Sequence, residues 1–68
     1  MKIHATTFEN QPVQYWYDPH CRCWFAMFVD SEGNQLGDCL DSFRKSDLLS
    51  MIQRGFLPMY AGQFGNER

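Results

Sequence analysis

Two short runs of β-branched and aromatic residues, separated by a turn, constrain this chain more than any other feature. The runs cover residues 13–17 and 23–29. Such residues favour extended backbone, and the segment between the runs begins with Asp18 and Pro19, which are typical turn residues. The sequence therefore predicts a β-hairpin at the centre of the chain.

The flanking segments extend this hairpin into a sheet. Residues 2–8 alternate in polarity as a half-buried strand would, and a turn is expected at 9–12. A second turn is expected at 30–35, where Gly33 and Asn34 can take positive φ, and a weaker strand follows at 36–41. The pattern predicts an antiparallel sheet of three or four strands.

A short helix should follow the sheet. Ser46 is the expected N-cap, Asp47 lies in the first turn, and Gly55 ends the helix. A helix of about two turns does not stand alone in water, so it must dock on the sheet. The residues expected to dock are Leu48, Leu49 and Ile52. The predicted class is α+β, a small antiparallel sheet packed on one short helix.

The length of the chain permits one thin core. A domain of 68 residues buries only about 60% of the surface that its unfolded chain exposes. We expect a single globular domain over residues 1–60 and a flexible tail over 61–68, which has two glycines and no periodicity. The chain shows neither a long apolar segment nor a signal peptide, so we expect no membrane association and a cytoplasmic location.

Both faces of the central hairpin are apolar, although one short helix covers only one face of a sheet. One interpretation is that the amino-terminal strand and the carboxyl-terminal tail wrap the second face and complete the core. The other is a contact surface for a protein partner or for a second copy in a homodimer. Two large aromatic side chains are then expected at the surface, from the set Trp16, Trp24 and Phe28.

The middle of the chain is acidic. No Lys or Arg interrupts residues 30–41, whereas Arg44 and Lys45 follow directly. Such a run forms either a solvated turn and strand edge, or a surface whose carboxylates bind Lys and Arg of a partner. The net charge of −2 and the pI near 5.4 argue against nucleic-acid binding. The acidic candidates for partner binding are Asp30, Glu32, Asp38 and Asp41.

Three cysteines and a histidine offer the ligand types of a zinc site, but their spacing does not match one. Paired zinc ligands are normally separated by two to four residues, and no second pair is present. We therefore expect no metal, no cofactor and free thiols. With no phosphate-binding loop and no carboxylate pair in an expected pocket, we predict no catalytic residues and no enzymatic activity. The candidate metal ligands are His20, Cys21, Cys23 and Cys39.

The order of elements resembles a known family. A strand, a hairpin, a turn with Gly33, the Leu36-Gly37 step and the Ser46-Asp47-Leu48 start of a helix are similar to small phage-encoded anti-CRISPR proteins of the sheet-plus-helix type. The resemblance covers residues 13–52. It implies a non-enzymatic inhibitor that binds a CRISPR surveillance complex in the bacterial cytoplasm and hinders target DNA binding.

Two alternatives remain open. Trp24, Ala26 and Val29 also look like the sheet of three-stranded DNA-binding domains in plant transcription factors and phage integrase arms. Those domains need cations on their strands, and the predicted strands offer little besides Arg22, so direct DNA binding is not expected. The other alternative is a homodimeric structural protein whose sheet faces bury each other.

Overall fold

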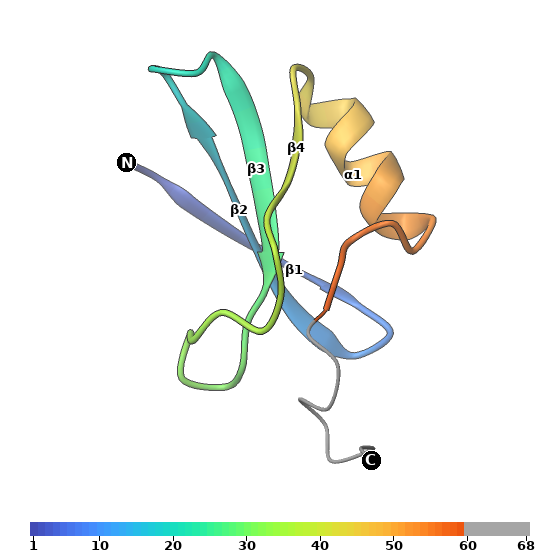
Figure 1. The fold of residues 1–68 in the computed structure, drawn as a ribbon. Coiled ribbons are helices and arrows are strands. Elements are labelled where there is room, and N and C mark those ends of the chain that lie inside the picture. The colour runs from blue at the N-terminus through green and yellow to red at the C-terminus, as the bar shows by residue number, and fades with distance from the viewer. Residues whose placement is uncertain (60–68) are drawn as a thin grey trace.

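The computed structural model describes residues 1–59 and confirms the predicted α+β class (Figure 1). A four-stranded antiparallel sheet has the order β1-β2-β3-β4, so each strand pairs with its neighbours in the sequence. The predicted tail at 61–68 lies outside the described residues. The elements are β1 (Ile3–Phe8), β2 (Gln11–Asp18), β3 (Cys23–Phe28), β4 (Leu40–Ser42) and α1 (Lys45–Gln53).

The turn between β1 and β2 is shorter than predicted. Glu9 and Asn10 alone form the loop, with φ of 50° and 70°, and Phe8 pairs with Gln11. Two consecutive residues with positive φ match the twist of antiparallel strands, which is why two-residue hairpins use them. The predicted turn at 9–12 was therefore too long, because its second half belongs to β2.

Pro12 lies inside the sheet, between β1 and β3, and its missing N–H is replaced by a side chain. The Val29 amide donates to the Pro12 carbonyl at 3.1 Å, and in a regular pair the residue at position 12 would donate back to the Val29 carbonyl. Proline has no donor. The Gln11 side-chain amide donates to the Val29 carbonyl instead, at 2.7 Å. This bond explains how a central strand accommodates proline.

Removing that donor should destabilise the fold. Val29 is 3% exposed, so Gln11→Ala leaves a buried carbonyl without its partner. We expect the free energy of unfolding to fall by about 1 to 3 kcal/mol, measured by urea denaturation with an unchanged m-value. Gln14→Ala, an amide on the other face of the same strand, is the matched control. Equal losses for the two variants would show that the Gln11 bond has no special role.

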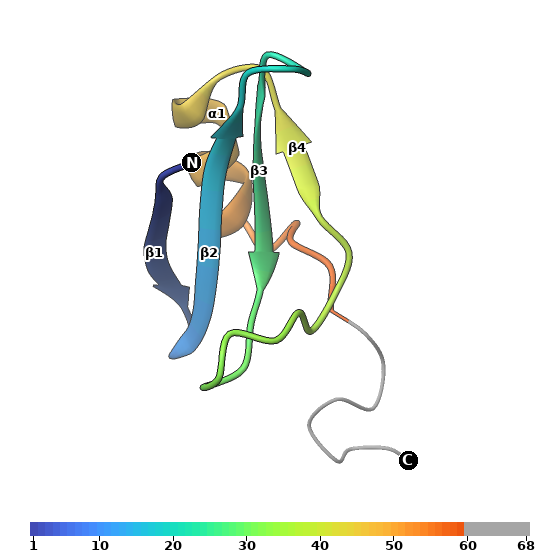
Figure 2. The same cartoon turned by 90° about the vertical axis from the view of Figure 1, so that its left-hand side faces the viewer.

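The helix covers one face of the sheet. α1 contacts β3 and β4, and Figure 2 shows the four strands side by side with α1 behind them. Leu48 and Ile52 have no exposed surface, and Leu49 is partly buried, so the predicted docking face is confirmed. The buried core consists of Val13, Tyr15, Ala26, Phe28, Leu36, Leu48, Ile52 and Leu57.

The start of α1 differs from the prediction, whereas its end agrees. Arg44, in extended backbone, is the N-cap and makes no capping bond through its side chain, so Ser46 is not the cap. Only two residues separate β4 from α1, and the chain therefore enters the helix before it reaches Ser46. At the other end Gly55 has φ of 82°, and the amides of Gly55 and Phe56 bond to Ile52 and Met51 in a Schellman motif.

The segment between β3 and β4 is mostly loop. The predicted strand at 36–41 is wrong in its first half, because β4 covers only Leu40–Ser42. Gly33 takes positive φ as predicted, at 87°, whereas Asn34 does not. Instead the Asn34 amide donates to Asp30 Oδ1 at 2.8 Å, which closes the turn.

Gly37 lies outside the sheet and packs closely against the chain that follows the helix. A Cβ built at Gly37 would overlap the Pro58 carbonyl and lie 2.7 Å from Met59 Cα. Both obstacles are backbone, so a side chain at this position would push two segments apart. The close approach therefore requires glycine.

Gly37→Ala should cost about 2 kcal/mol or more of unfolding free energy, in the upper part of the range for overpacking. Gly33→Ala is the control. A Cβ there would make only an ordinary contact, with Gln14 Nε2 at 3.9 Å, so the positive φ alone is strained, which costs about 1 kcal/mol. Thermal and urea melts compare the two. A Gly37 variant as stable as the Gly33 variant would contradict the packing argument.

Candidate protein-binding surface

The face of the sheet opposite α1 carries a continuous row of side chains across all four strands. The registers pair Ile3 with Trp16, Trp16 with Phe25, and Phe25 with Asp41. Directly paired residues of antiparallel strands point to the same face. We call this face the open face and these four residues the cross-sheet row.

The apolar part of the cross-sheet row is accessible. The Trp16 and Phe25 rings stack with centroids 6.0 Å apart and an interplanar angle of 26°, and both side chains are half-buried. Ile3 is 49% exposed. Stacking leaves the outer ring surfaces free for a partner, and Trp is the residue most enriched at interface hot spots. The row therefore combines apolar area with a fixed geometry.

Trp24 and Phe28 lie on the opposite face of the sheet from Trp16. Phe28 is 4% exposed within the core. Trp24 contacts Tyr15 and Tyr17, with centroids 6.2 and 5.5 Å apart, and Lys45 Nζ lies 5.6 Å from its ring centre. The helix side thus takes these two aromatics.

Phe25, which was not among the predicted contact residues, stands beside Trp16 instead. Alternation along the strand places it on the face opposite Trp24, but the register that sets it opposite Trp16 comes from the structure.

β1 does not wrap the open face. It pairs edge-on with β2 in the plane of the sheet and adds Ile3 to that face rather than covering it. On the helix side His4 stacks on Tyr15 with centroids 4.9 Å apart. The interpretation in which the amino-terminal strand wraps this face is therefore wrong for that strand; the tail, which was to share the role, lies outside the described residues.

The four predicted carboxylates do different things. Asp30 closes the turn after β3 by accepting hydrogen bonds from the amides of Glu32 and Asn34, and these bonds, that of Asn34 foremost, lower the pKa of Asp30. Glu32 is exposed in the same turn. Asp41 lies on the open face, and Asp38 lies in the loop before β4. Of the four, Asp41 alone belongs to the cross-sheet row.

The pKa values of two cysteines are raised in part by nearby carboxylates. Burial raises the pKa of Cys23, which is 6% exposed, and the nearby Cys21, Asp41 and Asp18 raise it further. Burial also raises the pKa of Cys39, and the charges of Asp38 and Asp41 add to it. Asp41 thus lies near both thiols. Over residues 1–59 no three His, Cys, Asp or Glu side chains are arranged to hold a metal ion, and the His20 amide donates to Asp18 Oδ1 at 2.8 Å.

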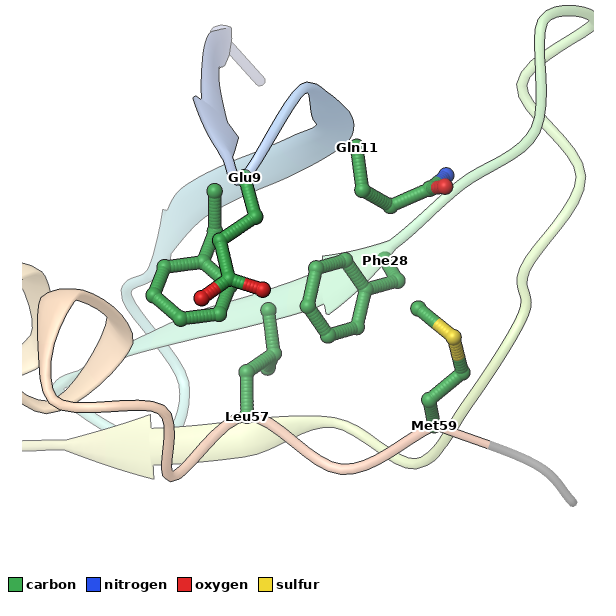
Figure 3. Close-up of a pocket in the computed structure, with 6 residues that line it drawn as sticks. Glu9, Gln11, Phe28, Leu57 and Met59 are labelled. Atoms are coloured by element: carbon green, nitrogen blue, oxygen red, sulfur yellow. The ribbon is translucent and has the colours of Figure 1, made fainter.

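A pocket on the helix side of the sheet was not anticipated from the sequence. Its volume is about 350 Å³, and Figure 3 shows the carboxylate of Glu9 and the amide of Gln11 beside an otherwise apolar lining. Phe28 belongs to this lining, so its accessible edge faces the pocket and not the open face. The full lining is Phe8, Glu9, Gln11, Phe28, Leu57 and Met59.

Comparisons of this chain with protein-family models, with curated proteins and with solved structures found no match. None of the helices described is both long and apolar enough to cross a membrane. The function is therefore inferred from the surface itself.

Asp41→Asn should make Cys39 more reactive. Removing this charge lowers the pKa of Cys39, which raises the fraction of reactive thiolate at a fixed pH below that pKa. Iodoacetamide labelling of the folded protein, followed by peptide mass spectrometry, measures the rate at each cysteine. Glu32→Gln is the matched control and should leave the Cys39 rate unchanged. An equal rate in wild type and Asp41→Asn would contradict the placement of Asp41 beside Cys39.

Proposed function

We propose that this chain is a non-enzymatic domain that binds another protein through its open face. The observation that carries the proposal is the cross-sheet row, in which two stacked aromatic rings and an exposed Ile3 lead to the carboxylate of Asp41. Aromatic anchors beside a charged rim are the usual anatomy of a protein interface. The partner should present an apolar pocket with a Lys or Arg next to it.

The charges of the open face favour a protein over DNA. Over the described strands, no Lys or Arg shares the face of the cross-sheet row, whereas Asp18 and Asp41 do. A sheet that binds DNA needs cations to neutralise phosphates. The alternative of a sheet-type DNA-binding module therefore has the wrong charge on this face.

The resemblance to small anti-CRISPR proteins supports a more specific proposal, in which the partner is a CRISPR surveillance complex and the chain acts as an inhibitor. An acidic, aromatic surface can occupy a basic site that target DNA would otherwise enter. In this proposal the protein works in the cytoplasm of a bacterial host. Its three cysteines would stay reduced there.

Trp16→Ala should weaken partner binding by about 30-fold, mainly through faster dissociation, because an anchor of this type contributes about 2 kcal/mol. Asp41→Asn should mainly slow association and flatten its salt dependence. Phe56→Ala is the control, because Phe56 is 53% exposed but directly follows α1, on the side of the sheet opposite the open face. Partners are captured from bacterial lysates with and without CRISPR machinery, and rates are then measured by biolayer interferometry with the purified partner.

Each outcome decides a different part of the proposal. If Trp16→Ala keeps its thermal melt and still binds at the wild-type rates, the open face is not the contact surface. If the captured partner is not a CRISPR component, the inhibitor proposal fails while protein binding stands. Submicromolar binding of plain duplex DNA at about 150 mM salt would instead favour the DNA-binding alternative.

A further inference from the structure

The two edge strands of the sheet differ in how well they are protected against pairing with another strand. β4 is three residues long and has Asp41 at its centre, which discourages further pairing. β1 spans six residues, Ile3–Phe8, with no charged residue and no proline. Edge strands with unpaired backbone groups are templates for another strand unless charges, proline or a bulge blocks them. The β1 edge lacks the first two protections, and its pairing with β2 runs in regular register from Ile3 to Phe8.

The outward backbone groups of β1 follow from the pairing pattern. The Val29 amide donates to the Pro12 carbonyl, so the backbone carbonyl of Pro12 faces β3. The backbone groups of its neighbours Gln11 and Val13 therefore face β1. Their partners in β1 are Phe8 and Thr6, which therefore point inward. Alternation then turns the N–H and C=O groups of Ile3, Ala5 and Thr7 outward, and no strand of the described residues pairs with them.

We infer that β1 pairs with β1 of a second copy of this chain, antiparallel and about a twofold axis at Ala5. Only this register pairs every outward-facing residue of one copy with an outward-facing residue of the other. Ala5 lies opposite its own copy, and Ile3 lies opposite Thr7. A twofold axis perpendicular to the sheet keeps the open faces of both copies on the same side. Two four-stranded sheets then form one sheet of eight strands.

The charges at the ends of β1 select a second copy as the occupant. Lys2 precedes the strand and Glu9 follows it, with no other charge between them. In an antiparallel pair the Lys2 end of one chain meets the Glu9 end of the other, at both ends of the interface. Ala5, at the axis, is exposed and small, so the two backbones can approach to the spacing of a normal ladder.

The dimer joins the two open faces into one surface. Ile3, the outermost residue of the cross-sheet row, lies next to the shared edge, so the rows of both copies become parts of a single larger face. An edge-to-edge contact of this length is smaller than a standard interface of about 1,600 Å², and we expect a dissociation constant in the micromolar range. The inference rests on the β1 edge and stands without the proposed partner binding.

Charged substitutions at the axis test the register directly. Ala5→Lys and Ala5→Glu each place two like charges opposite one another. Each should therefore raise the dissociation constant of the dimer about fivefold or more at low salt. An equimolar mixture of the two places opposite charges together and should recover a heterodimer. Sedimentation velocity over a concentration series measures the assembly. Gln14→Lys, on the same face but one strand inward, is the control and should dimerise like wild type.

Three results would overturn the inference. The first is wild-type protein that stays monomeric up to about 500 μM at low salt, far above the range expected for a weak interface. The second is a mixture of Ala5→Lys and Ala5→Glu that assembles no better than either alone, with both folds intact by circular dichroism. The third is a dimer that survives both variants but is lost in Trp16→Ala, which would place the contact on the open face.

Discussion

The pairing register between β2 and β3 decides which side of the sheet each aromatic side chain occupies. In this ladder Val13 pairs with Phe28 and Trp16 pairs with Phe25. The first pair points to the helix side of the sheet and the second to the open face. A slip of β3 by one residue would move its side chains to the opposite faces of the sheet, placing Phe28 with Trp16 on the open face and Phe25 under the helix. The Gln11 bond to the Val29 carbonyl holds the end of this ladder where Pro12 provides no donor. The core and the open face both depend on this register.

The short helix accounts for the division of the aromatic residues. α1 has nine residues and contacts β3 and β4, so it covers only part of one face. Beside it the rings of Tyr15 and Trp24 are tilted at 43° to each other, with centroids 6.2 Å apart, and lie beneath the Lys45 ammonium at 5.9 and 5.6 Å. The opposite face receives no such cover from the described elements.

The acidic residues are divided between structure and surface in a similar way. Asp30 is committed to the turn after β3, where its carboxylate accepts hydrogen bonds from Glu32 and Asn34. Asp41 is free of such bonds among the described residues and lies on the open face at the β4 edge. The same carboxylate is thus the charged end of the cross-sheet row and the charge at the centre of one edge strand. The β1 edge has no charged residue along its length, so it lacks the protection that Asp41 gives to β4.

The sequence by itself determined the class of fold, the central hairpin, the docking face of α1 and its glycine stop, because these depend on local periodicity and on residues with strong backbone preferences. It did not determine the helix start, where the two-residue link from β4 overrode Ser46, or the length of β4, where the contact of Gly37 with residues 58–59 drew the chain away. The composition of the open face was also a tertiary outcome. Trp16, Trp24 and Phe28 are equally suited to a core or a surface by chemistry, and only the cross-strand register and the position of the helix separated them.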